Sequence, residues 1–576
     1  MKSVRSYLKK KAVGVFETRT DDSVIIIDGN YFKYASYLRK VLTSFINNGV
    51  ECYVIFGGGM KADLEKRKEI HQNIINKTDA VQPGCEENEY CEPTFVKDVQ
   101  REIFEELGIR YFICEYDHSE ALLSLAMDYN FPVLTNNFEY CLFGITCIIP
   151  NSLVFDVDQG FRCTVYHPDK KLFPLTDDLM SILLAISDED SPYYKHMPRI
   201  LRCHEKTIFV SAQHWIRRQT KTSAIEALTK YLTPSDKQYL LDTVSQIKKL
   251  FRCSKHHVAE SFHSHHVLKT KIIDTEIRGW FERAVSNGLI AIPYINLKNN
   301  KTFSGSWLIV DKTKNDAMLV TLDLVFYALG LLTNTRNLKI TFIGRQFTTS
   351  VIWDIEKTLP SRRALELFRS QNEECPRSVD LFRVIIQELL HGFDFVSLDS
   401  LPEDCHMIII ALVYYSVKNA DFKRGVYSVI MSYFMLGQIS KEVGVLKRSN
   451  FAVTHNTKGN KNQDQYVSSA NAFMDFFYLN ESHIKNIFYR DVLHTIAEFE
   501  HCLQHVNFLN RLCGEKTTCT IYHKAINTTF VYNLLITLKY EDNPLDYLKM
   551  RMNCHRIYTE YEQFINVFEK CLTSVK

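Results

Sequence analysis

Glycine and proline are scarce in this chain, with 21 Gly and 14 Pro among 576 residues. So low a content excludes a collagen-like or largely disordered protein. A strong charge of either sign is also missing, because 69 Lys and Arg nearly balance 67 Asp and Glu and leave a formal net charge of +2. Any surface that binds anions must therefore be a local patch.

Long apolar runs are absent as well. The longest candidates are residues 407–417 and residues 318–332, both shorter than the roughly 18 apolar residues of a membrane span. The N-terminus lacks the apolar segment and the cleavage site of a signal peptide. We therefore expect a soluble intracellular protein, nuclear or cytoplasmic, with no membrane partner. The 16 Cys form no Cys-x-x-Cys pair, which favours reduced and mostly buried thiols over a disulfide framework.

Short apolar runs alternate with amphipathic segments over the first 170 residues. The runs predict strands at residues 23–28, 52–56, 111–114, 132–135 and 146–149. The segments between them predict helices at residues 31–48, 61–77, 92–107 and 117–129. This alternation indicates an α/β fold with a parallel sheet covered on both faces.

Beyond residue 170 the apolar spacing of three and four predicts a mainly helical chain. The predicted helices include residues 179–186, 225–232, 237–250, 277–287 and 323–332, with a break and a new start at Pro234. A chain of this length suits about two to four domains. We expect a core over residues 1–170, a helical continuation over residues 171–270 and a helical region over residues 271–576.

Acidic residues follow several of the predicted strands and one helix. They are Asp28, Glu115, Asp117, Glu139 and Asp188, with Asn137 and Asp190 nearby. Ligands of parallel sheets sit at the carboxyl ends of the strands, and carboxylate oxygens suit Mg²⁺ or Mn²⁺. Two such ions could stabilise a phosphodiester displacement. The alternative is that acids are common at such positions and that Asp117 caps the helix that follows it.

These residues resemble the flap-endonuclease and XPG nuclease family, and most closely its asteroid branch. The resemblance rests on segments spread along the chain, which are 1–8 in a degraded form, 26–29 (Ile-Ile-Asp-Gly), 55–59 (Ile-Phe-Gly-Gly-Gly), 115–118 (Glu-Tyr-Asp-His), 131–140, 185–188 and 226–232. It implies a PIN-like nuclease core followed by a long asteroid-type helical region. It also implies that Asp28, Glu115, Asp117, Glu139 and Asp188 hold Mg²⁺ or Mn²⁺ and are the catalytic residues.

The chain departs from the family pattern at three of the implied metal positions. Gly57 and Asn137 stand where the family has aspartates, and Glu139 replaces an aspartate by a longer carboxylate. Gly offers no ligand side chain and Asn offers no charge. Because Mg²⁺ demands near-octahedral geometry, we expect weak or lost catalysis.

The resemblance also implies a nucleic-acid surface after the glycine-rich turn. Lys61, Lys66, Arg67 and Lys68 stand where the family presents basic residues to the substrate strand, and Tyr34 stands where it stacks a tyrosine on a base. The alternatives are a solvated helix and a core tyrosine. Acidic residues at 86–89 count against tight binding there, and the histidines at residues 256–266 lack the spacing of a common zinc site.

Two functions remain open from the sequence. The first is an asteroid-like, structure-specific nuclease that acts on single-stranded, flap or overhang nucleic acid, DNA above all, with a partly degraded metal site. The second is a non-catalytic scaffold whose helical region binds a protein partner. The sequence does not decide whether the protein is an enzyme.

Overall fold

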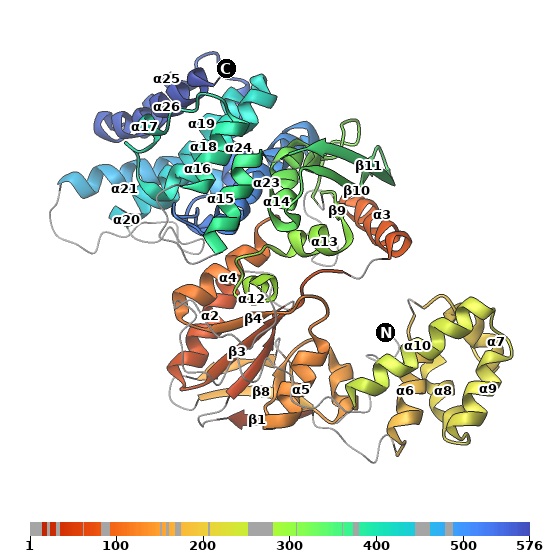
Figure 1. The fold of residues 1–576 in the computed structure, drawn as a ribbon. Coiled ribbons are helices and arrows are strands. Elements are labelled where there is room, and N and C mark those ends of the chain that lie inside the picture. The colour runs from red at the N-terminus through yellow and green to blue at the C-terminus, as the bar shows by residue number, and fades with distance from the viewer. Residues whose placement is uncertain are drawn as a thin grey trace. The chain divides into compact units, whose positions relative to one another are not determined.

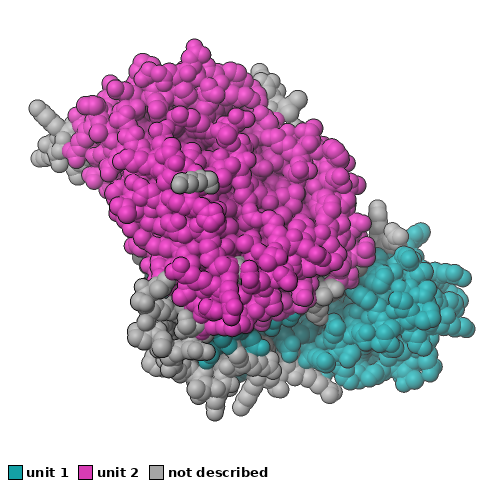
Figure 2. All heavy atoms as spheres, turned by 45° about the horizontal axis from the view of Figure 1, so that its top comes forward, with its two compact units in different colours: residues 1–58, 103–287 teal, residues 59–102, 288–576 magenta. Residues whose placement is uncertain are grey.

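The computed structural model describes most of the chain, namely residues 14–19, 24–29, 35–60, 63–81, 93–149, 152–156, 160–166, 174–189, 191–204, 208–251, 280–306, 308–359, 361–372, 380–443, 461–478 and 488–575. The chain forms two compact units (Figure 2). Unit 1 comprises residues 1–58 and 103–287, and unit 2 comprises residues 59–102 and 288–576. This division differs from the expected linear one, because residues 59–102 belong with the C-terminal part of the chain.

A twisted sheet lies at the centre of unit 1 (Figure 1). Its strands are β1 (Gly14–Arg19), β2 (Val24–Asp28), β3 (Glu51–Phe56), β4 (Arg110–Ile113), β5 (Val133–Leu134), β6 (Cys147–Ile148), β7 (Val154–Asp156) and β8 (Gly160–Tyr166). The order is β1-β8-β6-β5-β2-β3-β4, and β7 pairs with β8. The five strands from β6 to β4 run parallel, while β8 runs antiparallel to β1, β6 and β7. The predicted parallel sheet is thus confirmed, and three strands that were not predicted extend one edge.

The central strands of this sheet are apolar along most of their length because both faces of the sheet are covered. Residues 25–28 of β2 are buried throughout, as expected for a central parallel strand. The helices α2 (Ala35–Asn47) and α5 (Ser119–Tyr129) belong to the same α/β core. The chain adds β3 on one side of β2 and β5 on the other, so strand order reverses between β2 and β5. In open α/β sheets, ligands bind at the carboxyl ends of the strands at such a point.

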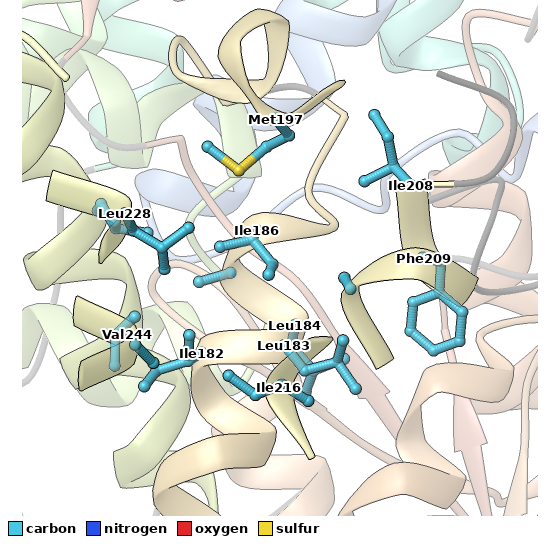
Figure 3. Close-up of a cluster of buried hydrophobic side chains, with 14 of the residues drawn as sticks. Ile182, Leu183, Leu184, Ile186, Met197, Ile208, Phe209, Ile216, Leu228 and Val244 are labelled. Atoms are coloured by element: carbon cyan, nitrogen blue, oxygen red, sulfur yellow. The ribbon is translucent and has the colours of Figure 1, made fainter. Parts of the chain in front are cut away.

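A group of helices with its own core completes unit 1. Its members are α6 (Asp177–Ile186), α7 (Met197–Leu201), α8 (Ile208–Ile216), α9 (Lys221–Thr229) and α10 (Pro234–Leu250). The later helix α12 (Trp280–Ser286) lies instead beside β4, as Figure 1 shows. Figure 3 shows the core, in which Ile182 and Ile186 of α6 lie with Leu228 and Val244. The hydroxyl of Thr233 accepts a hydrogen bond from the N–H of Asp236 at 3.1 Å and caps α10, which confirms the predicted helix start at Pro234.

Unit 2 is mainly helical and contains a small sheet. Its helices are α3 (Leu64–Ala80), α13 (Ile292–Asn300), α14 (Leu322–Thr333), α15 (Arg362–Asn372), α16 (Leu381–Leu389), α17 (Phe395–Leu398), α18 (His406–Lys418), α19 (Lys423–Tyr433), α20 (Ser440–Val443), α21 (Lys461–Phe473), α23 (Arg490–Leu512), α24 (Thr528–Lys539), α25 (Pro544–Met552) and α26 (His555–Ser574). One further helix, α4 (Val96–Leu107), is divided between the units at residue 102. The apolar run at residues 407–417 lies in α18, whose first ten residues are all buried.

The sheet of unit 2 was not predicted from the sequence. It consists of β9 (Thr302–Ser304), β10 (Asn337–Gln346) and β11 (Thr349–Thr358) in the order β11-β10-β9. β10 and β11 form an antiparallel hairpin, and α3 packs against both strands, as Figure 1 shows. The missed signal was the two-residue alternation in the first half of β10 and the second half of β11, where more buried and more exposed side chains take turns.

No described helix is long and apolar enough to cross a membrane. The cysteines within the described ranges are free thiols, and only Cys203 and Cys554 are partly exposed. The expectation of reduced, mostly buried thiols is therefore confirmed for that part of the chain.

Candidate functional site

Asp28 ends β2 at the point where strand order reverses. Its carboxylate is nearly buried, with 8% of the residue exposed. The Nε2 atom of His118 lies 2.9 Å from its Oδ1, and the hydroxyl of Thr135 donates to its Oδ2 at 2.9 Å. Both oxygens of Asp28 therefore have a side-chain partner, one from the start of α5 and one from the end of β5.

His118 lies between two carboxylates. Its Nδ1 is 3.6 Å from Oδ1 of Asp117, whose side chain is 67% exposed. Asp117 also accepts hydrogen bonds from the N–H of Ser119 at 3.2 Å and from its hydroxyl at 3.0 Å. These bonds support the alternative that Asp117 caps α5, because its carboxylate accepts a hydrogen bond from a backbone N–H in the first turn, where the helix itself offers no acceptor.

The residues after β5 extend this network. The backbone N–H of Asn137 donates to the hydroxyl of Thr135 at 2.9 Å. Glu139 is buried in the 3₁₀ helix η2 (Phe138–Phe143), and the hydroxyl oxygens of Tyr140 and Ser119 are 3.2 Å apart. Burial, and after it the nearby carboxylate of Asp28, raises the pKa of Tyr140 above its usual range.

The glycine-rich turn after β3 is held by a close approach of two backbones. The N–H of Gly58 donates to the carbonyl of Tyr116 at 2.7 Å. A Cβ atom on Gly58 would lie 1.9 Å from the carbonyl oxygen of Cys114 and 2.6 Å from that of Glu115. Glycine is therefore required at residue 58, and this contact positions Glu115 beside the turn that contains Gly57.

Asp188 follows α6, and its backbone carbonyl accepts hydrogen bonds from the N–H and the hydroxyl of Ser191. Asp190 lies outside the described residues. Among the residues that the structure describes, which include all five predicted carboxylates, no group of three or more His, Cys, Asp or Glu side chains is placed to hold a metal ion. Since Asp28 is bonded to His118 and Thr135, this arrangement does not fit a preformed two-metal site.

The predicted nucleic-acid residues behave differently from one another. Tyr34 and Lys61 lie outside the described residues. Lys66 is exposed and Lys68 is half-buried on α3, which belongs to unit 2. The acidic segment at residues 86–89 and the histidines at residues 256–266 also lie outside the described part of the chain.

Arg67 corrects the expectation of a phosphate contact. It is only 4% exposed, and its guanidinium donates to the hydroxyl of Thr302, the carbonyl of Met60 and Oδ1 of Asn296. The buried residues of α3 are Arg67, His71, Ile75 and Thr78, which share one face of the helix. The buried face of α3 was not predicted, because residues 66–68 are all cations and charged residues usually remain in solvent.

The contact between Asp28 and His118 was not recognised in the sequence. The two residues are 90 positions apart, and Thr135 is 107 positions from Asp28. His118 had been noticed only as the last residue of the segment 115–118. Because β2 lies between β3 and β5, Asp28 and Thr135 come to the same edge of the sheet. Which side chains then bond to Asp28 depends on how α5 packs, and this packing cannot be inferred from the sequence.

Comparisons with known proteins point to the asteroid family. The model of the family described as the asteroid N-terminal domain matches residues 404–576. No curated protein matches the chain. The match lies in unit 2, over the region from α18 to α26.

Similar solved structures include two proteins in complex with DNA. The catalytic core of Rad2 in complex with a DNA substrate is 14% identical, with 43% of this chain and 80% of that chain covered and a TM-score of 0.25. Human GEN1 in complex with Holliday junction DNA is 12% identical, with 57% and 78% covered and a TM-score of 0.27. Likenesses at these scores carry no argument about activity. The family match agrees with the resemblance read from the sequence: this chain is asteroid-like, and its residues 404–576 match the model of the asteroid N-terminal domain.

Proposed function

We propose that this protein is an asteroid-like, nuclease-fold protein that binds single-stranded or branched DNA and cleaves it weakly or not at all. The observation that carries the expectation of weak or absent cleavage is the bonding of Asp28, while DNA binding rests on the resemblance to the flap-endonuclease family. Its two carboxylate oxygens are held by His118 and Thr135 at the edge of the sheet where a metal would need them.

The physical argument concerns competition for one carboxylate. Mg²⁺ binds oxygen at about 2.0–2.1 Å in a near-octahedral shell and tolerates little distortion. An ion at Oδ1 of Asp28 would have to share or displace the contact with His118. The neighbouring positions do not compensate, because Gly57 has no side chain and Asn137 carries no charge. We therefore derive no hydrolytic step from this arrangement.

A binding and cleavage assay on the full chain tests this proposal. Single-stranded, flap and overhang DNA would be incubated with the protein in Mg²⁺, in Mn²⁺ and in a chelator, and both binding and cleavage would be measured. We expect binding that survives the chelator, and little or no cleavage in either metal. Robust metal-dependent cleavage that disappears in Asp28→Asn would overturn the proposal, whereas cleavage that persists in that variant would indicate a contaminating nuclease.

A non-catalytic scaffold is the second candidate, and one observation favours it. The helix expected to face a substrate strand is built into unit 2, where Arg67 bonds to Asn296 and Thr302, and Asp79 bonds to Arg345. These bonds hold one face of the helix within unit 2, so that this face is not available to a substrate strand. A wild-type chain that binds none of the three DNA probes, yet is a folded protein by circular dichroism, would favour the scaffold.

A further inference from the structure

The tip of the β10–β11 hairpin holds an aromatic side chain in an unusual backbone conformation. Gln346 and Thr349 pair across the strands, so that Phe347 and Thr348 form a two-residue loop. Phe347 has a φ of +55° and is 61% exposed, while Thr348 has no positive φ. A positive φ is a conformation that glycine adopts readily and that other residues rarely adopt.

Phenylalanine at this position costs stability. A positive φ crowds the Cβ atom of any residue other than glycine against the backbone, so glycine would be more stable at this position. Exposure of most of the ring recovers little of that cost through burial. Strain of this kind is found where the surrounding structure enforces it, and often at functional sites.

The surrounding residues do enforce this conformation. The Nε atom of Arg345 donates to the carbonyl of Phe347, and the side-chain amide of Gln72 on α3 donates to the carbonyl of Thr348 at 2.9 Å. Gln72 also accepts a hydrogen bond from the N–H of Ser350 at 2.7 Å. Both carbonyls of the loop are therefore fixed by side chains.

These side chains are themselves held in place. Arg345 is buried, and its guanidinium bonds both carboxylate oxygens of Asp79 on α3, at 2.8 and 3.0 Å. The backbone N–H of Arg345 donates to the buried Asp316 at 2.8 Å. The Nδ1 atom of His71 lies 3.0 Å from the hydroxyl of Ser350. Phe347 thus projects from a rigid joint between the hairpin and α3.

The surroundings of the ring favour a base over a protein surface. Over residues 337–358, all of which the structure describes, Phe347 is the only large apolar side chain that is mostly exposed. Its neighbours Gln346, Thr348 and Thr349 are polar and exposed. Protein-binding anchors usually lie within an apolar patch, whereas a single aromatic ring suffices to stack on a base of any sequence.

We propose that Phe347 stacks on an unpaired base of single-stranded nucleic acid, with Lys68 available for a neighbouring phosphate. Lys68 lies one helical turn before Gln72 on α3, so the two residues share a face of the helix, and Gln72 is the residue that bonds the loop. This inference rests on the nucleic-acid binding of the proposed function and assigns a contact for it to a residue of unit 2, whereas the predicted carboxylates belong to unit 1.

Substitution by glycine tests the stacking without risk to the fold. Phe347→Gly places the preferred residue at the strained position, so its melting temperature should equal or exceed that of the wild type. The probe is an oligothymidylate strand with one 2-aminopurine, whose fluorescence reports stacking and whose anisotropy reports affinity. We expect the full chain to quench the probe, and Phe347→Gly to bind about 5- to 150-fold more weakly with the quenching lost.

Three further variants separate stacking from apolar contact and from charge. Phe347→Trp should keep the affinity and the quenching, whereas Phe347→Leu, which keeps apolar bulk without an aromatic face, should lose both. Lys68→Gln should reduce the log–log salt dependence of binding by about 0.7. An RNA strand of the same sequence shows whether the contact distinguishes the two sugars.

The outcomes are distinct. If the wild type binds and Phe347→Gly binds equally well, the stacking inference is overturned while the proposed function stands. If Phe347→Leu matches the wild type, the side chain is an apolar anchor, as for a protein partner, and stacking is again overturned. If the wild type does not bind the strand at all, both the inference and the proposed function fail.

Discussion

Two buried aspartates, one in each unit, show how differently this chain uses a carboxylate. Asp28 in unit 1 is bonded by the side chains of His118 and Thr135. Asp316 in unit 2 is 2% exposed and accepts three backbone N–H groups, from Ser306, Met318 and Arg345. Backbone donors cannot turn away, whereas side-chain donors can. Asp316 is therefore a fixed joint of the small sheet, and Asp28 belongs to a site that substitution can rearrange.

The largest effect should come from removing the fixed joint. In Asp316→Ala, three buried N–H groups lose their acceptor, and we expect the free energy of unfolding of unit 2 to fall by about 3–5 kcal/mol. The matched change Asp28→Ala should cost only about 1–2 kcal/mol, because it deprives two side-chain donors of their acceptor rather than three backbone N–H groups. Urea denaturation followed by circular dichroism measures both. Equal costs would contradict the comparison.

A smaller effect is expected from the buried cation of α3. Arg67→Met removes the donors of three acceptors around Met60, Asn296 and Thr302, and should cost about 2–4 kcal/mol. Its neighbour Lys66 is exposed, so that Lys66→Met should change stability by less than about 0.5 kcal/mol. Thermal unfolding of the two variants makes the comparison. A loss of DNA affinity in Arg67→Met without a loss of stability would restore Arg67 as a phosphate contact.

Unit 2 should also lose stability in acid because of two buried histidines on α23. Burial lowers the pKa of His501 to about 4 and that of His505 to about 3. Both histidines take up a proton more readily in the unfolded chain, so their contribution is complete above pH 6.5 and declines as the pH falls below that value. Buried Asp98, Glu102 and Glu500 act in the opposite direction, since burial raises the pKa of each.

A histidine variant isolates this dependence from the opposing carboxyls. In His505→Gln, the fall in unfolding free energy between about pH 6.5 and 4 should weaken by about 1.4 kcal/mol per pH unit. Denaturation at several pH values provides the slope. A slope identical to that of the wild type would show that His505 does not titrate with unfolding.

The smallest change in stability, and the most informative for the site, concerns His118. His118→Ala should cost about 1–2 kcal/mol and leave Oδ1 of Asp28 accessible to a cation, so that Mn²⁺ binds more tightly by calorimetry. His118→Gln keeps a donor at this position and serves as the control, with little change expected. The gain should vanish when Asp28→Asn is added to His118→Ala. Equal Mn²⁺ binding in the wild type and in His118→Ala would show that His118 does not restrict the metal.

Local sequence decided the strands and most helices of the part that the structure describes. The three isoleucines of β2 have no polar alternation, which is possible only in a strand buried on both faces. Thr233 and Pro234 mark the start of α10 because the hydroxyl caps a free N–H and proline fits the first turn. Such signals act over a few residues, and the sequence displays them directly.

The tertiary structure decided the partners of these elements. Nothing near residues 59–102 shows that α3 packs on β10 and β11, since its Gln72 bonds to Thr348 and Ser350, more than 200 positions away. The bonding of Asp28 by His118 and the strained turn at Phe347 likewise depend on residues distant in the chain. Burial and hydrogen bonding between remote segments have no local periodicity. The chemistry of each site was therefore fixed only when the two units folded.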